Sequence, residues 1–429
     1  MLKLSASLLL ALMAIFNFLP IAEPSLPAWL SGLCGWLSLA LLFTFTPWRN
    51  FIQFLVLAGI GGLLLIWGAS QGATISVPNL LVQNNSLLVM LYSVSFLRLV
   101  ALPAAEAGEL PRGRLAFIKT MLGIHILGAI INLSILVLVA GRYYDQGLLR
   151  RDTVTLMGQS FSAAAFWSPF FAAMGVALTY APSAQLLQVM AYGLILTLLS
   201  LSLITVLAGG WGLHKVSDFP GYPMQLRSLL IPASLAALVI GLHLLLPEIS
   251  ILALVSTSSI ALVFIVLLMR SRQTAWPNFR QHLVSAAPRM ARELALFLGA
   301  GVLTLGLQTA LSTVGEFQML TQFTGVEAAL LLGAAILISM IGIHPIISVA
   351  VIGPLVLPLQ PNLEFLAVLF LSMWSLGVVA NPISGTNVML HGQFGVAGRD
   401  AFLWNLKYVI LMWLLTSLVF VVLGASLAK

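Results

Sequence analysis

Residues 371–390 read LSMWSLGVVANPISGTNVML, and the run Asn381-Pro382-Ile383-Ser384-Gly385-Thr386-Asn387 interrupts an otherwise apolar stretch. A proline and a glycine weaken a helix at this point, and the four polar side chains are costly in hydrocarbon. Irregular backbone at membrane depth survives only where protein buries it or where it lines a water-filled cavity. The stretch therefore predicts a broken membrane helix over 365–392, with the break at a polar site. An ordinary proline kink is the plainer alternative.

The composition predicts an all-α polytopic membrane protein. The chain of 429 residues is 60% hydrophobic and 7% charged, and its repeated apolar runs are long enough to cross a bilayer. The net charge of +7 comes from basic residues in short loops, which indicate topology and no nucleic-acid partner. A single cysteine, Cys34, excludes an internal disulfide. No nucleotide-binding or metal-binding motif is found, so we expect no cofactor and no metal other than a coupling ion.

The charge distribution predicts which apolar segments cross the membrane. If all of the apolar segments crossed, the basic residues on the two sides of 117–140 would lie on opposite faces, against the positive-inside rule. Treating 117–140 as a cytoplasmic hairpin and 328–358 as an external hairpin leaves about 11 transmembrane helices. Every basic residue except Lys429 is then inside. We therefore expect a multi-pass protein of the inner membrane, with the N-terminus in the cytoplasm and the C-terminus outside.

Two short near-copies suggest an internal duplication. Met121–His125 reads MLGIH and Met340–His344 reads MIGIH. An odd number of crossings in each half would make the halves an inverted repeat, with the two hairpin tips opposed near the membrane midplane. A chance match between apolar sequences is the alternative.

These patterns divide the chain into a first transmembrane helix and two repeats. The predicted parts are residues 1–24, the first repeat 25–215 with hairpin 117–140 and broken helix 160–180, and the second repeat 216–429 with hairpin 328–358 and broken helix 365–392.

The candidate solute-binding and ion-binding residues lie at the predicted tips and breaks. They are Gly123, His125, Asn132, Ser162, Ser168, Gly342, His344, Pro345, Ser348, Asn381, Ser384, Gly385, Thr386 and Asn387. Asparagine, serine and threonine side chains and freed backbone groups can bind an ion, and the start of a half-helix favours an anion. The run Trp167-Ser168-Pro169 is a weaker break, equally compatible with a kink.

Two coupling ions remain open from the sequence. His125 and His344 titrate near physiological pH and could carry a proton, although each could also be a neutral hydrogen-bonded histidine. Alternatively, Gly123, Gly342, Asn381 and Asn387 could hold sodium. The histidines at span ends, among them His282, are predicted to be interfacial. No aspartate falls in a predicted span, which disfavours a cationic substrate.

The predicted topology resembles that of the divalent anion/sodium symporter family of the ion transporter superfamily. In that family the hairpin tips carry Ser-Asn-Thr, whereas here they carry Gly123-Ile124-His125 and Gly342-Ile343-His344-Pro345. Only 381–387 resembles the polar break of the family. The resemblance implies a carboxylate-type solute, an elevator motion and a homodimeric scaffold.

The sequence thus predicts a secondary active transporter of a small anionic solute, coupled to H⁺ or Na⁺, with membrane lipid as its surroundings. One alternative is an intramembrane hydrolase or lipid-modifying enzyme, with His125 or His344 as base and Ser162, Ser168 or Ser384 as nucleophile. The other alternative is an anion channel of the same fold.

Overall fold

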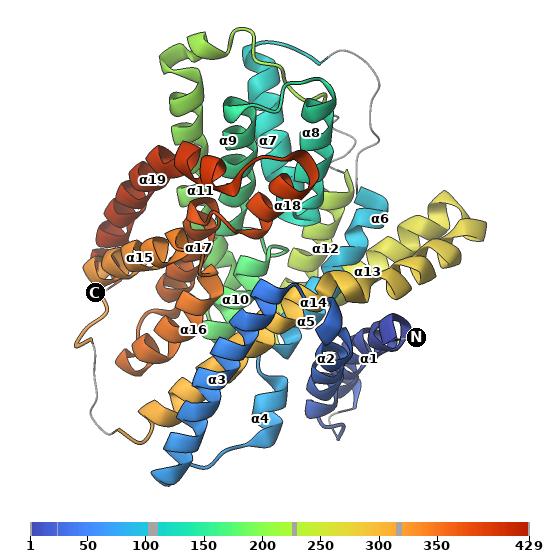
Figure 1. Cartoon of the computed structure of the whole chain (residues 1–429), viewed down its shortest axis with the longest axis vertical. Helices are drawn as coiled ribbons and strands as arrows, with labels where there is room; N and C mark the ends of the chain where they lie inside the picture. The colour runs from blue at the N-terminus through green and yellow to red at the C-terminus, as the bar shows by residue number, and fades with distance from the viewer. Residues whose placement is uncertain (1, 24, 102–109, 225–229, 315–319, 428–429) are drawn as a thin grey trace. The chain divides into compact units, whose positions relative to one another are not determined.

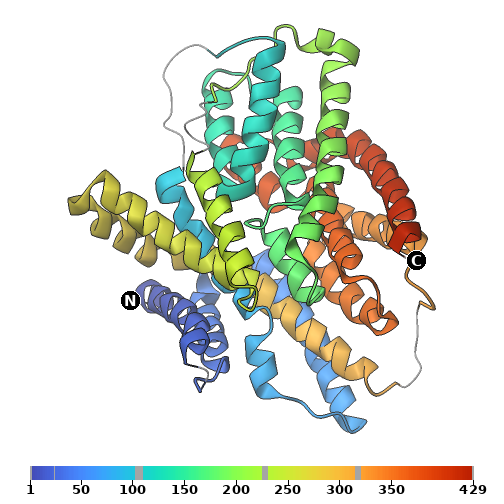
Figure 2. The same ribbon diagram turned by 180° about the vertical axis from the view of Figure 1, so that it is seen from behind.

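The computed structural model describes residues 2–23, 25–101, 110–224, 230–314 and 320–427, and its regular elements are helices (Figures 1 and 2). Their bounds are α1 Leu2–Ala22, α2 Trp29–Leu42, η1 Phe43–Phe45, α3 Trp48–Ser70, α4 Val77–Val82, α5 Asn85–Val94, η2 Ser95–Leu97, α6 Arg98–Ala101, α7 Arg114–Ile131, α8 Ser134–Asp145, α9 Arg151–Ser162, η3 Ala163–Phe166, α10 Ala172–Tyr180, α11 Leu186–Gly209, η4 Trp211–Val216, α12 Leu230–Leu245, α13 Ile251–Arg270, α14 Arg272–Leu311, α15 Gly325–Met340, α16 Pro345–Val356, η6 Leu357–Leu359, α17 Leu363–Ala380, α18 Gly385–Phe394 and α19 Gly398–Leu427.

The predicted fold class is confirmed. Within the described ranges, nine helical segments are long and apolar enough to cross a membrane, and four shorter apolar helices accompany them. Helices satisfy their own backbone hydrogen bonds, which is what a chain without water around it requires. The protein is an all-α, multi-pass membrane protein.

The helices group into two compact units. Unit 1 comprises Met1–Val100, Ser234–Met319 and Ala350–Leu355, and unit 2 comprises Ala101–Ala233, Leu320–Val349 and Val356–Lys429. Each unit takes segments from both halves of the sequence, so the units and the predicted repeats divide the chain differently.

In unit 1, α14 packs along α3 at a close glycine crossing. A Cβ added to Gly306 would lie 2.2 Å from the carbonyl oxygen of Gly61, so the two backbones touch without intervening side chains. At 40 residues, α14 is about 60 Å long, roughly twice the thickness of the hydrocarbon layer. Its basic first half therefore extends beyond that layer.

In unit 2, α7 and α8 form a helical hairpin whose turn is at Asn132. Asn132 has a φ of 55° and a ψ of −142°, which lie outside the helical regions and end α7. The amide of Gly113, before α7, donates to Phe219 O (3.0 Å), and Tyr143 Oη, near the end of α8, donates to Pro220 O (2.8 Å). Both ends of the hairpin thus meet the same loop, so α8 folds back along α7.

The predicted position of the first tip is wrong. Gly123 and His125 lie inside α7, about two helical turns before the turn at Asn132. Gly123 is covered by Met224, whose Cγ would be 2.4 Å from an added Cβ, so this glycine permits close packing within a continuous helix.

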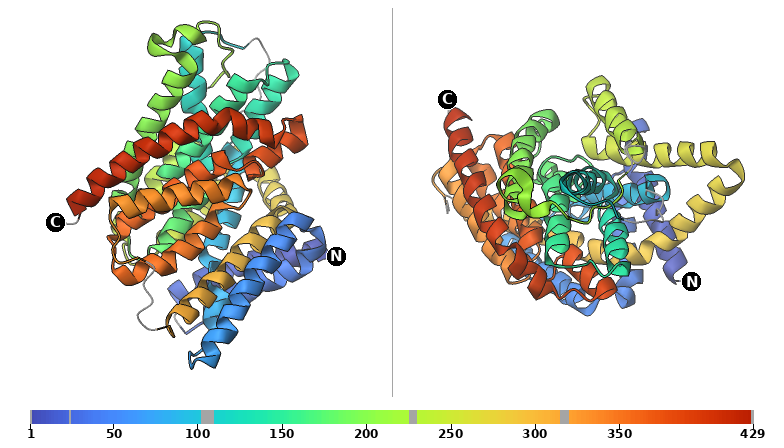
Figure 3. Two further views of the ribbon diagram at one scale, coloured as in Figure 1. Left: turned by 60° about the vertical axis from the view of Figure 1, so that its left-hand side comes forward. Right: turned by 90° about the horizontal axis from the view of Figure 1, so that it is seen from above.

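The second hairpin joins α15 and α16 through a turn at Gly342, which has a φ of 94°. Its first arm, its turn and the start of α16 up to Val349 belong to unit 2. Its start is a capping box, in which Thr324 and Glu327 hydrogen-bond to each other and to the first turn of α15. The hydrogen bond from Thr324 lowers the pKa of Glu327 to about 2. Helix α19 packs against α15 and α17, as Figure 3 shows.

Two helices of unit 2 are interrupted. The first consists of α9 and η3, a break over 167–171 and α10, and the second consists of α17, a break over 381–384 and α18. The first interrupted helix begins at Arg151, nine residues before the predicted start at 160. The sequence analysis missed this part because its first turn, Arg-Asp-Thr, is too polar to look like a membrane-spanning segment. Pro169 and Pro382 disfavour helical backbone at the residue before them, which accounts for both interruptions.

Candidate functional site

The second break is attached to the tip of the second hairpin through Asn381. Asn381 Nδ2 donates to the carbonyl oxygen of Ile343 in the turn (3.0 Å), and its Oδ1 accepts from the amide of Ile383 (2.9 Å). The Asn381 side chain is 2% exposed. One buried amide therefore satisfies backbone groups that the break and the turn would otherwise leave unpaired.

Helix α18 begins directly after this break. Ser384 is its N-cap and accepts from the amide of Asn387 (3.3 Å), while Asn387 Nδ2 donates back to the carbonyl of Asn381 (2.9 Å). The positive end of the α18 dipole thus lies inside unit 2 among buried polar groups, an arrangement that favours an anion.

Three buried hydroxyls in this region have no hydrogen-bond partner among the described residues. They belong to Thr386 at the start of α18, Ser339 near the end of α15, and Ser348 in α16. Thr386 is 5% exposed, and Ser339 Oγ lies 2.8 Å from where a Cβ of Gly377 would be. A buried unpaired hydroxyl is costly unless something else binds it. Thr386, within the polar run itself, is the strongest candidate to contact a solute or ion.

The first hairpin also reaches α18. An added Cβ on Gly385 would be 3.7 Å from Leu133 in the turn of the first hairpin. In the first break, Ser168 Oγ donates to Ala129 O of α7 (2.5 Å) and accepts from the amide of Phe170 (3.2 Å). Each break is therefore hydrogen-bonded to its own hairpin, and both hairpins approach the second break.

The two interrupted helices are joined just before their breaks. Ser375 Oγ in α17 donates to the carbonyl oxygen of Ser162 at the end of α9 (2.8 Å). The Ser162 hydroxyl itself donates to Gln159 O (3.1 Å). The backbone of Ser162 therefore connects the two broken helices.

His125 is fixed as a neutral histidine. The Trp167 indole, which can only donate, gives its Nε1–H to His125 Nε2 (3.1 Å), so His125 Nδ1 carries the proton and donates to Ser160 O (3.2 Å). The ring is 4% exposed. Protonating Nε2 would leave two N–H groups facing each other, so the structure favours the structural interpretation of His125 over a proton-carrying one.

His344 has a different environment at the tip of the second hairpin. It is half-buried, its ring lies edge-on to Trp374 with centroids 5.0 Å apart, and its Nδ1 accepts from the amide of Ile346 (3.3 Å) in the first turn of α16. Protonation of Nδ1 would remove that acceptor. Pro345 is the first residue of α16, a position that needs no amide hydrogen.

The structure therefore brings most of the predicted residues to the two hairpins and two breaks of unit 2. The turns hold Asn132, Gly342 and His344, the breaks and their flanks hold Ser162, Ser168, Asn381, Ser384, Gly385, Thr386 and Asn387, the start of α16 holds Pro345 and Ser348, and the interior of α7 holds Gly123 and His125.

Sequence reasoning missed a second group of buried polar residues in unit 2. Gln159 Nε2 donates to Asn405 Oδ1 (2.8 Å), and the hydroxyls of Ser200 and Tyr408 hydrogen-bond at 2.7 Å. These bonds join α9 and α11 to α19. The sequence does show a glutamine and an asparagine within apolar helices. It does not show that they pair, because they are 246 positions apart.

The serines named for the hydrolase alternative are engaged with backbone. Ser162 and Ser168 donate to carbonyl oxygens, and Ser384 accepts from the amide of Asn387. A histidine base activates a serine that hydrogen-bonds to it, and among the described residues these three serines have other partners.

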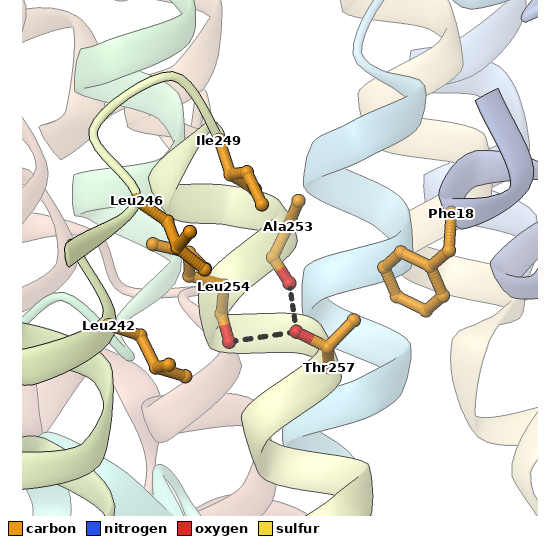
Figure 4. A pocket seen from close by; sticks show the side chains of 7 residues that line it. All are labelled: Phe18, Leu242, Leu246, Ile249, Ala253, Leu254 and Thr257. Carbon is orange, nitrogen blue, oxygen red and sulfur yellow. Dashed lines mark hydrogen bonds between the residues drawn. The ribbon is translucent and has the colours of Figure 1, made fainter. Parts of the chain in front are cut away.

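The described residues of unit 1 include the linings of two cavities to which none of the predicted site residues contributes. One, of about 300 Å³, is apolar (Figure 4), because the Thr257 hydroxyl donates to the carbonyls of Ala253 (2.8 Å) and Leu254 (3.2 Å) of its own helix. The other, of about 580 Å³, includes Asn17, Asn85 and Ser86 among its lining residues.

No protein-family model matches the chain, and no curated protein matches it in sequence. Among solved structures, it is similar to the crystal structure of the YdaH transporter of Alcanivorax borkumensis, described as having an unusual topology. The match has a TM-score of 0.53 and 16% identity, and it covers 86% of this chain and 98% of that one. At this identity the likeness shows a shared fold alone, and it does not single out the divalent anion/sodium symporter family.

Proposed function

We propose that this protein is a secondary active transporter of a small anionic, carboxylate-type solute, coupled to H⁺ or Na⁺. The observation that carries the proposal is the break at 381–384, attached to a hairpin tip by the Asn381–Ile343 hydrogen bond and followed by a helix start inside unit 2. Broken helices whose ends meet at a buried polar site are the usual solute-binding device of secondary transporters. The fold shared with a transporter supports the same proposal.

The solute would bind between the break and the hairpin turns, with its carboxylate at the start of α18 and the Thr386 hydroxyl. An inverted-repeat relation between the two hairpin-and-break elements and an elevator-type movement of unit 2 belong to the same proposal. Each element consists of a hairpin, an interrupted helix and a further long helix, in that order.

The test is uptake by the purified full chain in proteoliposomes, over a panel of labelled mono- and dicarboxylates. Imposed pH and sodium gradients are applied separately. Accumulation above the external concentration, driven by one of these gradients, is the expected result and excludes a channel, which only equilibrates its solute. Absence of gradient-driven accumulation for every carboxylate, with the protein folded, would contradict the proposal.

A further inference from the structure

A group of basic side chains in unit 1 surrounds the short segment 95–101, which comprises η2 and α6. Arg270 Nη2, at the end of α13, donates to Val100 O (2.8 Å). His282 of α14 hydrogen-bonds through Nε2 to Ser95 Oγ (3.0 Å), and its ring lies on Phe96 with centroids 4.3 Å apart. His282 is 4% exposed and is therefore buried within unit 1. Its position at the membrane interface stays a prediction.

Two more arginines complete the group. Arg98, the first residue of α6, is half-buried and interacts electrostatically with Arg289 of α14. His282 and Arg289 are seven residues apart and therefore lie on the same face of α14. Both arginines also interact electrostatically with His282. Arg98 lies in the short segment, Arg270 hydrogen-bonds to it, and Arg289 lies on the face of α14 that carries His282, which hydrogen-bonds to Ser95 of the same segment.

No carboxylate pairs with Arg98, Arg270 or Arg289 in the part of the chain that the structure describes. Arg98 is half-buried, whereas Arg270 and Arg289 are exposed. Like charges held close together repel each other, and an anion between them relieves that repulsion. Guanidinium groups match the geometry of phosphate oxygens and bind them in pairs. The three arginines therefore match the geometry and charge of a phosphate group.

The surface beside this group is apolar and aromatic. Trp276 is 57% exposed and stacks on Phe279, which in turn contacts Phe96 with centroids 5.0 Å apart. Met269, next to Arg270, is 81% exposed. Arginine and tryptophan together at the end of an apolar helix are typical of the level of the lipid headgroups. A molecule bound at this surface would contact cationic groups at one end and apolar side chains at the other.

We propose that Arg98, Arg270 and Arg289 bind the phosphate of an anionic phospholipid, with its acyl chains on the apolar surface at the corner of α13 and α14. The basic segment 270–292 is also the one that the positive-inside rule places at the anionic cytoplasmic leaflet. The three arginines all belong to unit 1, and the site is independent of the solute proposed for unit 2.

The experiment measures the lipid retained by the purified full chain after exchange into nanodiscs of phosphatidylcholine with a small fraction of phosphatidylglycerol. We expect enrichment of phosphatidylglycerol around the protein. The double variant Arg98→Gln/Arg289→Gln should lower the apparent affinity roughly 25-fold, since each of the two cations near a lipid headgroup contributes roughly a factor of five. The matched control is Arg272→Gln/Arg280→Gln, which removes two exposed arginines of the same helix.

Three outcomes would overturn the proposal. Equal loss in the control would mean that only general surface charge attracts the lipid. Displacement of the lipid by millimolar inorganic phosphate would mean that the site binds a free anion. Absence of phosphatidylglycerol enrichment around the wild-type protein would mean that the arginines bind no anionic lipid. Thermal unfolding of the Arg98→Gln/Arg289→Gln variant separates loss of the site from loss of fold, and Arg289→Lys, which keeps the charge, should recover part of the affinity.

Discussion

At the scale of single residues, the hydroxyl of Thr386 offers the sharpest test of the solute site. Valine has the same shape but no hydroxyl, and Thr386 has no partner to lose among the described residues. Thr386→Val should therefore leave the melting temperature unchanged or slightly raised, and lower the rate of uptake by at least tenfold. The measurements are thermal unfolding in detergent and initial uptake in proteoliposomes. Thr416→Val, which removes another buried unpartnered hydroxyl in α19, is the control and should keep full uptake.

The two histidines should respond differently to the same substitution. His344→Gln should reduce the dependence of uptake on external pH, because protonation of His344 removes the acceptor that caps α16 and glutamine does not titrate. His125→Gln should keep that dependence and instead destabilise the protein by about 1–3 kcal/mol, because the Trp167–His125–Ser160 hydrogen bonds are disturbed. Uptake that follows a sodium gradient and ignores a pH jump in wild type would assign the coupling to sodium.

At the scale of helices, the crossing of α3 and α14 depends on Gly306. Gly306→Ala places a methyl group 2.2 Å from the Gly61 carbonyl, so the two helices must separate. We expect a loss of about 1–3 kcal/mol, seen as a lower melting temperature. Gly62→Ala, in the same part of α3 but with nothing within 4 Å, is the control and should be neutral or stabilising. Equal melting temperatures for both variants would contradict the close crossing.

Some of the helices and their interruptions could be predicted from the sequence, and others could not. Composition and the polar run at 381–387 were sufficient for an all-α membrane fold and for the second interrupted helix. The near-copies at Met121 and Met340 led to the wrong prediction that both lie at hairpin tips. The first lies inside α7, and the second spans the end of α15 and the turn that follows. Glycine suits both a tight packing position and a positive-φ turn, so the residue type could not distinguish them. The partner of His125, Trp167, is set by tertiary packing that no local pattern encodes.

At the scale of the whole molecule, the orientation in the membrane can be tested with cysteine labelling. Cys34 is buried and is the single cysteine of the chain, so Cys34→Ser provides a background without thiols. In that background, Gln71→Cys should react with a membrane-impermeant maleimide in intact cells, and Gln146→Cys should react only after permeabilisation. The reverse labelling would invert the predicted topology.

The hydrogen bond between Asn381 and Ile343 also sets how easily the second hairpin can leave the break. A neutral intramolecular hydrogen bond contributes about 0.5–1.5 kcal/mol net, which corresponds to an opening equilibrium of roughly one part in two to one part in thirteen. A hydrogen bond of this strength is formed most of the time, yet thermal motion alone is enough to break it. Access to the start of α18 would then be governed by the spontaneous release of one amide group, and the slow step of a transport cycle would lie in a larger movement.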